Sequence, residues 1–182
     1  ENNQTTISKK ISLKGVGLHT GKDVTLTFVP SIADSGYVFK RIDLESSPTM
    51  RADIKYVSST ERGTCLNKNG LIIQTCEHVL AALVGSEIDN VIIELNESEP
   101  PIMDGSAKFF VDALEKAGIK ELDTKRKEFI VKKVISFKDE DTGSEIMVLP
   151  AKNYKVTTMV DFGTKILGTQ NATIDSISEF IP

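Results

Sequence analysis

The chain has 182 residues, of which 40% are hydrophobic and 26% charged, a composition ordinary for a soluble globular protein. Its formal net charge is −4 and it has no cluster of basic residues, which argues against nucleic acid as its main partner. No apolar run approaches the roughly 20 residues of a membrane-spanning helix, and no signal peptide opens the chain. We expect a cytoplasmic protein whose two cysteines, Cys65 and Cys76, are reduced.

The first part of the chain predicts strands followed by two helices. Residues 24–29 alternate apolar and small polar side chains, which is typical of a strand with one buried face. Further strands are expected at residues 11–13, 37–42, 71–73 and 91–95. The last of these is apolar and β-branched, so we expect it at the centre of a sheet.

Two short amphipathic helices are expected in the same part. In the first, Thr75 is the predicted N-cap and Gly85 the predicted stop. Its buried stripe is expected to consist of Val79, Leu80, Ala82 and Leu83. The second helix is predicted between a Ser106 cap and a Gly118 stop. Its apolar residues repeat at helical spacing: Ala107, Phe110, Val111, Leu114 and Ala117.

Residues 122–127 are charged and lack periodicity, so we predict a boundary there, with domains at residues 1–123 and 124–182. Beyond the boundary, strands are expected at 129–131 with 134–135, at 146–149 and at 156–162. A short helix is expected to start near Asp175. This second segment therefore predicts a sheet that lacks the helices needed to cover it.

The pair Glu77-His78 opens the first predicted helix. The unpaired N–H groups and partial positive charge of a helix start favour an ionised Glu77 and a neutral His78. A neutral imidazole beside a carboxylate is what a metal-dependent hydrolase requires. The alternative is a solvated acid beside a packed helix residue. No second histidine follows one turn later, as it does in the His-Glu-x-x-His zinc proteases.

Four separated segments carry a resemblance to a known family. They are residues 15–21 (GVGLHTG), 62–66 (RGTCL), 74–85 (QTCEHVLAALVG) and 101–107 (PIMDGSA). In this order they resemble the zinc-dependent UDP-3-O-acyl-N-acetylglucosamine deacetylases of Gram-negative bacteria, which carry out the committed step of lipid A synthesis. The resemblance runs from about Ile7 to Asp175. Residues 160–163 (VDFG) and 168–171 (GTQN) look most like those of members from the Bacteroides lineage, some of which are fused to a dehydratase domain.

The resemblance implies an α+β fold with two similar domains. Each domain is expected to be a mostly antiparallel sheet with helices on one face, and the two are expected to pack helix layer to helix layer around the active site. By this resemblance, residues 1–123 form the whole first domain. Residues 124–182 form only the opening sheet of the second domain, which is incomplete here.

The resemblance also implies hydrolysis of the N-acetyl group of UDP-3-O-acyl-N-acetylglucosamine, with Zn²⁺ as the cofactor. Glu77 is then expected to be the general base and His78 a zinc ligand. In the family, the other two zinc ligands are a His and an Asp on a helix of the second domain, so the remaining part of that domain is needed to complete the site. Two alternatives stay open: a binding or scaffold domain without catalysis, and one half of a split enzyme.

Four residues are implied in substrate binding. The turn that contains His19 and Thr20 is expected to border the active-site cleft, with His19 in contact with the diphosphate; the alternative is a tight hairpin with an exposed histidine. Asp161 and Phe162 are expected where the uracil ring docks. Their alternative is an ordinary acid at the end of a strand and an aromatic residue of the core.

Three other features have structural interpretations. Asp104 is expected to orient the helix that follows Ser106. Cys65 and Cys76 are expected to be small buried hydrophobic residues, because no Cys-x-x-Cys spacing points to a structural metal site. The glycines of residues 15–21 do not form a dinucleotide-binding fingerprint, because the segment that follows is strand-like where a helix is needed.

Overall fold

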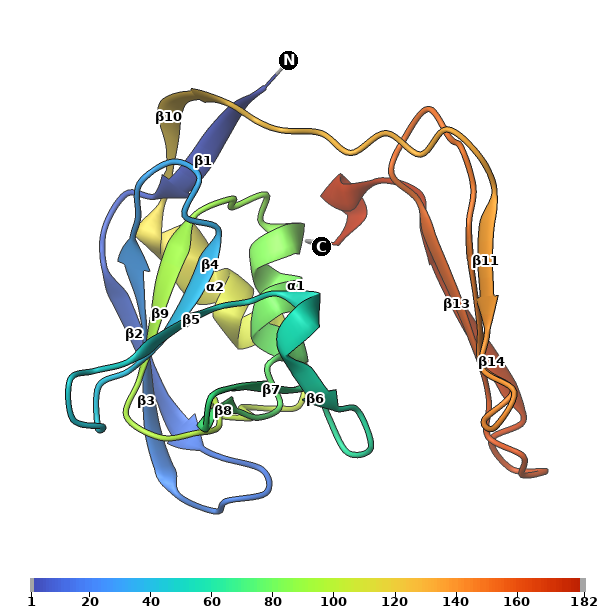
Figure 1. Ribbon diagram of the computed structural model, residues 1–182, viewed down its shortest axis with the longest axis horizontal. Coiled ribbons are helices and arrows are strands. Elements are labelled where there is room, and N and C mark those ends of the chain that lie inside the picture. The colour runs from blue at the N-terminus through green and yellow to red at the C-terminus, as the bar shows by residue number, and fades with distance from the viewer. Residues whose placement is uncertain (1, 181–182) are drawn as a thin grey trace. The chain divides into compact units, whose positions relative to one another are not determined.

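The computed structural model describes residues 2–180, apart from the side chain of residue 178. The chain divides into two compact units, residues 1–126 and residues 127–182, and Figure 1 labels most of their helices and strands. Residues 181–182, which belong to the predicted second domain, lie outside the described residues.

The division between the units lies inside the predicted boundary segment 122–127, three residues after the predicted domain limit at residue 123, because the chain forms a strand there. β10 (Ile119–Lys125) pairs antiparallel with β1 (Asn3–Ile7), and neither strand is evident from the sequence pattern. Immediately after β10, Arg126 Nε lies 3.0 Å from Asp89 Oδ1. The division between the units therefore comes after Arg126 and not after residue 123.

The main sheet of the first unit has five strands in the order β2-β3-β9-β4-β5. Their bounds are Ile11–Val16 for β2, Asp23–Pro30 for β3, Val91–Leu95 for β9, Tyr37–Arg41 for β4 and Thr49–Arg51 for β5. All neighbours are antiparallel except β4 and β9, which are parallel. The prediction that residues 91–95 form a central strand is confirmed.

The register of this sheet stacks large apolar side chains. Ile93 of β9 lies opposite Phe28 of β3 on one side and opposite Phe39 of β4 on the other. All three side chains are fully buried. Each Å² of apolar surface that is buried contributes about 25 cal/mol to the free energy of folding, so this row of side chains is a main source of stability for the unit.

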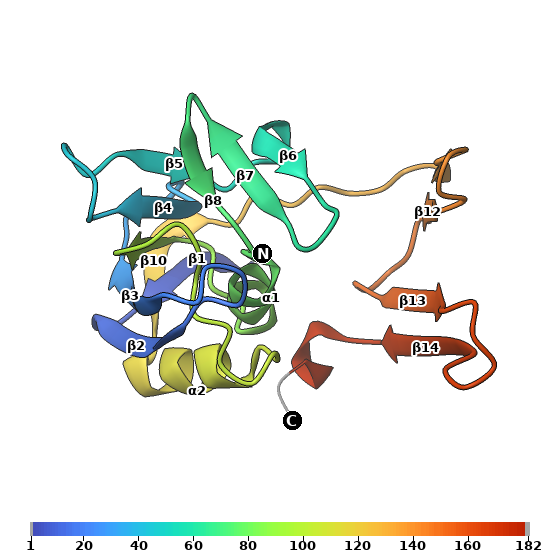
Figure 2. The ribbon, with the colours of Figure 1, turned by 90° about the horizontal axis from the view of Figure 1, so that it is seen from below.

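Both helices cover the same face of the main sheet, as Figures 1 and 2 show. α1 spans Glu77–Gly85 and α2 spans Lys108–Ala117, and the two helices contact each other. The first unit is therefore an α+β domain with helices on one face, as predicted. Within residues 2–180, none of the helices combines the length and the apolar character that crossing a membrane requires.

A small three-stranded sheet leads into α1. It is formed by β6 (Val57–Ser59), β7 (Cys65–Lys68) and β8 (Leu71–Ile73), and a 3₁₀ turn, η1 (Ile54–Tyr56), precedes it. β6, β7 and β8 pair in that order, each antiparallel to the next. The predicted strand at 71–73 is confirmed, and it delivers the chain directly to the start of α1.

The ends of α1 differ from the prediction. Cys76, and not Thr75, occupies the N-cap position, and its side chain makes no capping hydrogen bond. Thr75 has a positive φ of 48° and donates its hydroxyl to Glu99, so it is unable to cap the helix. Gly85 is the last residue inside the helix, and the N–H of Ser86 closes it by donating to Ala82. Of the predicted stripe, Val79, Ala82 and Leu83 are buried, whereas Leu80 is half-buried.

The start of α2 agrees better with the sequence. Ser106 Oγ accepts a hydrogen bond from the N–H of Lys108 at 3.2 Å, although Ala107 occupies the formal cap position. Asp104 Oδ1 accepts from the N–H and the hydroxyl of Ser106, at 3.0 and 2.7 Å. The structural role predicted for Asp104 is therefore confirmed. Gly118, with a φ of 72°, ends the helix as expected.

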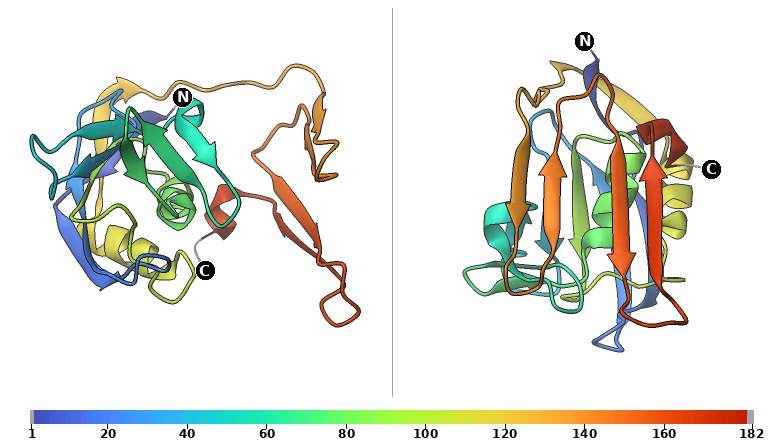
Figure 3. Two further views of the ribbon diagram at one scale, coloured as in Figure 1. Left: turned by 60° about the horizontal axis from the view of Figure 1, so that its bottom comes forward. Right: turned by 90° about the vertical axis from the view of Figure 1, so that its right-hand side faces the viewer.

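The second unit consists of two antiparallel hairpins, drawn in orange and red in Figure 3. β11 (Ile135–Lys138) pairs with β12 (Glu145–Val148), and β13 (Val156–Asp161) pairs with β14 (Thr169–Ile174). The strand predicted at 129–131 is wrong, because no described strand pairs with it. β14 is polar and is missing from the prediction, and the helix expected near Asp175 is only a 3₁₀ turn, η2 (Ile177–Glu179).

Candidate active site

Glu77 and His78 form the first two residues of α1. Glu77 is half-buried, and its Oε2 accepts a hydrogen bond from the backbone N–H of Thr64 at 2.9 Å. His78 is also half-buried, and within residues 2–180 neither of its ring nitrogens has a hydrogen-bond partner. The local structure thus fixes the carboxylate and leaves the imidazole available to a ligand.

The segment before β7 shapes the space around Glu77. Gly63 has a φ of 144°, and a Cβ at this position would lie 3.2 Å from Glu77 Oε1. Thr64 binds the start of α1 twice more through its carbonyl oxygen, which accepts from the N–H and the thiol of Cys76, both at 3.3 Å. These contacts give the carboxylate a fixed position at the start of the helix.

Both cysteines are free, as expected for reduced thiols. Cys76 is fully buried and Cys65 is half-buried. Burial, followed by the nearby Glu77 carboxylate, raises the pKa of the Cys76 thiol to about 12. Because metal binding and nucleophilic attack require the thiolate, Cys76 acts here as a small buried hydrophobic residue, as predicted.

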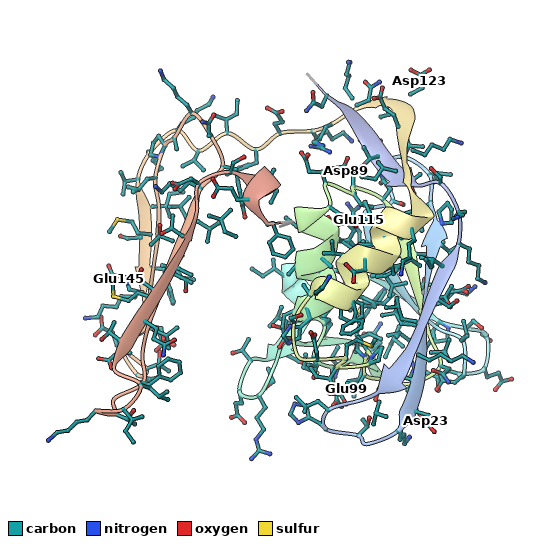
Figure 4. All side chains as sticks on the ribbon, turned by 180° about the vertical axis from the view of Figure 1, so that it is seen from behind. Asp23, Asp89, Glu99, Glu115, Asp123 and Glu145 are labelled. Carbon is teal, nitrogen blue, oxygen red and sulfur yellow. The ribbon has the colours of Figure 1, made fainter. Side chains whose placement is uncertain are left out.

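The sequence reasoning missed Glu99, which is fully buried among the loops below the helices (Figure 4). Its Oε1 accepts a hydrogen bond from the hydroxyl of Thr75 at 2.8 Å. Its Oε2 accepts from the backbone N–H of His19 at 3.0 Å and from that of Thr20 at 2.9 Å. A single buried carboxylate therefore connects the β2–β3 turn to the residues that precede α1.

Hydrogen bonding keeps Glu99 ionised in spite of its burial. Burial by itself would raise the pKa of the Glu99 carboxyl, but hydrogen bonds from Thr20, Thr75 and His19 hold that pKa below its ordinary value of 4.5. In the sequence, Glu99 is an acid between a strand and two prolines, which is typical of a solvated loop residue. Only the spatial arrangement of distant donors reveals its role.

His19 lies in a hairpin turn, as the strand-like segment after residues 15–21 predicts. Gly17 N donates to Lys22 O at 3.0 Å, and β2 and β3 continue in antiparallel register from this turn. The His19 side chain is exposed, and its Nε2 lies 3.1 Å from Arg62 O. Because Arg62 and Thr64 belong to the same short segment, that segment contacts both the His19 ring and the Glu77 carboxylate.

Three of the four resembling segments thus meet around the start of α1. The family model described as LpxC, UDP-3-O-acyl N-acetylglycosamine deacetylase, matches residues 4–181. The chain belongs to this deacetylase family.

Individual relatives point to the same family. The chain is 43% identical over 177 residues to the bifunctional enzyme LpxC/FabZ of Bacteroides thetaiotaomicron, covering 97% of this chain and 38% of that protein. It is 39% identical over 171 residues to the UDP-3-O-acyl-N-acetylglucosamine deacetylase of Geotalea uraniireducens, covering 94% of this chain and 55% of that protein. The chain therefore spans between about two fifths and a little over half of the length of these relatives.

The second unit holds the other two residues that the deacetylase resemblance singles out. Asp161 ends β13, and its Oδ1 accepts from the N–H of Gly163 at 2.9 Å. The N–H of Phe162 donates to Gly168 O at 3.1 Å, while the residue is 46% exposed. Phe162 is therefore not a core aromatic residue in this structure, and its role in nucleotide binding stays a prediction.

The described residues do not supply a full set of ligands for the metal ion that is expected in a member of this deacetylase family. Within the described residues, no three His, Cys, Asp or Glu side chains are grouped closely enough to hold a metal ion. The chain has two histidines, and the His19 ring contacts a backbone carbonyl while the His78 ring is free to bind. His78 thus offers one nitrogen ligand, and the described residues do not complete a site around it.

Proposed function

We propose that this chain provides the general base and one zinc ligand of a deacetylase that acts on UDP-3-O-acyl-N-acetylglucosamine. The products are UDP-3-O-acyl-glucosamine and acetate. We propose that this reaction is the committed step of lipid A synthesis in the cytoplasm of a Gram-negative bacterium. The observation that supports this most strongly is the start of α1, where Glu77 is held by Thr64 and the His78 ring is free. Membership of the deacetylase family gives this pair its chemical meaning.

In this proposal, Glu77 moves the proton. A zinc ion held by His78 and by ligands from the remaining part of the protein would lower the pKa of its bound water toward about 7 and would polarise the amide carbonyl. Glu77 Oε2 already accepts the Thr64 N–H, so we assign the proton of the attacking water to Oε1.

His78 is proposed as one of three protein ligands. A catalytic zinc ion needs three such ligands and one open position, and the described residues supply one. We propose that a His and an Asp from the remaining part of the second domain complete the set. We also propose that the two domains of the protein pack helix layer to helix layer.

The substrate-binding residues are proposed in two groups. His19 and Thr20 lie in the turn that Glu99 and Arg62 hold, and we assign His19 to the diphosphate. Asp161 and Phe162 are assigned to the uracil ring, with an acceptor for a base N–H and an aromatic face for stacking. The exposure of Phe162 is compatible with this assignment.

Acetate release by a full-length protein that contains this chain tests the proposal. The protein is purified with zinc, stripped with a chelator and reloaded, and acetate release from the UDP-sugar is measured at each stage. The proposal expects activity that disappears with the metal and returns with it. A scaffold domain gives no activity at any stage, and one half of a split enzyme gains zinc and activity only when its other half is added.

A further inference from the structure

Glu99 is a buried carboxylate whose charge is satisfied by hydrogen bonds from uncharged groups. It is fully buried, and within residues 2–180 no Lys, Arg or His side chain forms an ion pair with it. Its hydrogen-bond donors include the backbone N–H groups of His19 and Thr20, the Thr75 hydroxyl and the Thr20 side chain. Burying an isolated charge costs free energy unless hydrogen bonds satisfy it. The buried, ionised carboxylate is therefore stable only while these donors stay in place around it.

The donors belong to segments that are distant in the sequence. His19 and Thr20 lie in the β2–β3 turn, and Thr75 lies immediately before α1. The turn is shaped closely around the carboxylate, because a Cβ added at Gly17 would lie 2.3 Å from Thr20 Oγ1 and 2.7 Å from Glu99 Oε2. Only a glycine leaves room for this approach.

The backbone near Glu99 is tied to both segments as well. Ser98 O accepts from the N–H of Gln74 at 2.8 Å, and the N–H of Ile102 donates to Val16 O at 2.9 Å. Thr75 has a φ of 48°, an uncommon conformation for a β-branched residue. The 2.8 Å hydrogen bond from its hydroxyl to Glu99 helps to hold that conformation one residue before Cys76 and two before Glu77.

We propose that Glu99 is a positioning residue, whose ionised carboxylate holds the His19 turn against the start of α1 and so places His19 for substrate binding. This inference rests on the proposed function, in which His19 contacts the diphosphate. It assigns Glu99 no contact with the substrate. Glu99 affects the reaction by fixing the position of the His19 turn.

The first test uses the full-length, zinc-loaded protein and Glu99→Gln. The amide keeps the shape of the side chain but directs an NH₂ group toward N–H or O–H donors, so the turn loses acceptors. We expect KM for the UDP-sugar to rise by about fivefold or more, the range expected when buried donors lose their partners, while zinc content and kcat change by less than about threefold. Glu97→Gln is the matched control, because Glu97 binds Lys22 of the same hairpin at 3.0 Å through an exposed ion pair.

A double-mutant cycle separates positioning from a general loss of structure. In a His19→Ala background, Glu99→Gln is expected to raise KM by less than about twofold, because the residue through which it acts is gone. If the effect of Glu99→Gln on KM is the same in both backgrounds, or if KM in the single variant matches that of Glu97→Gln, the proposal is wrong.

A measurement that needs no activity completes the test. In the 182-residue chain, the amide protons of His19 and Thr20 should exchange slowly, lose their protection in Glu99→Gln and keep it in Glu97→Gln. Inactivity of the wild-type full-length protein would refute the proposed function, whereas unchanged protection in Glu99→Gln would refute the role of Glu99. Should Glu99→Gln fail to fold, Thr75→Ala removes one hydrogen bond and keeps the carboxylate. It is expected to give a smaller change in the same direction, and no change would overturn the proposal.

Discussion

The Oε2 atom of Glu77 and the backbone nitrogen of Thr64 lie 2.9 Å apart, so the residue that precedes β7 fixes the acid at the start of α1. The Thr64 carbonyl in turn accepts the N–H of Cys76 at 3.3 Å. A general base must keep its orientation toward the reacting water, and losing about 1 Å of precision can reduce a rate about 100-fold. The link between Thr64 and Glu77 supplies that orientation before any ligand binds.

Replacing Glu77 by Gln should abolish most activity without affecting the fold. The amide oxygen can still accept the Thr64 N–H, but an amide does not take a proton. In the full-length enzyme we expect zinc content to be unchanged and acetate release to fall by roughly 10²–10⁴-fold. Glu115→Gln, an exposed position on α2, serves as the control. Near-normal turnover of Glu77→Gln would remove Glu77 from the role of base.

The sequence predicts those parts of the fold whose signals are local. The strand at Val91–Leu95 is predicted to be central because four of its five residues are apolar and three of these are β-branched, a pattern that favours strand partners on both sides. α2 is recognised from its apolar spacing and from Gly118, whose positive φ ends the helix. Four short segments also identify the family, and three of them lie around the start of α1.

The parts that the sequence did not predict depend on partners that are distant in the chain. β1 and β10 are polar strands that lie near opposite ends of the first unit in the sequence. Each forms a strand because it pairs with the other. Threonine is a residue type that often caps helices, but the hydroxyl of Thr75 donates a hydrogen bond to Glu99 instead. Glu99 itself is separated by 79 and 80 positions from its donors Thr20 and His19, so no local pattern marks it.

Phe162 should contribute to nucleotide affinity and not to chemistry. Truncation to Ala removes an aromatic face that is 46% exposed in this structure. Stacking of a base on an aromatic side chain is worth about 1–3 kcal/mol, so the affinity for a uridine nucleotide, measured by calorimetry on the full-length enzyme, should fall by about 5- to 150-fold. Zinc content should not change. Phe137→Ala, at a 65% exposed position of the same unit, provides the control, and equal affinities in both variants would contradict the assignment.

Glu99 should make the stability of the chain depend on pH in the acid range. Because the folded-state pKa of its carboxyl lies below the ordinary value of 4.5, its contribution is present above that value and is lost as the pH falls through the folded-state pKa. Denaturant unfolding of wild type and Glu99→Gln between pH 7 and pH 3 measures this contribution. The difference in unfolding free energy between the two should shrink on acidification, and a difference that does not depend on pH would show that Glu99 is not ionised.

Residues 1–182 alone should be a poor zinc binder and a poor deacetylase. One free imidazole beside Glu77 does not supply the three ligands of a tight catalytic site. We expect substoichiometric zinc by metal analysis after dialysis, and no measurable acetate release from the UDP-sugar. Stoichiometric zinc with turnover would show that other residues of this chain complete the site.

The same 182 residues should also self-associate through the second unit. Ile135, Val148 and Val160 are 48%, 39% and 46% exposed, and exposed apolar patches of this kind promote association. Sedimentation analysis should show concentration-dependent association that weakens when Val148 and Val160 are both replaced by Lys. Because Val148 lies in β12 and Val160 in β13, the double variant places a charge on each hairpin without altering the first unit, which should keep its folded spectrum. A chain that stays monomeric at high concentration would contradict this prediction.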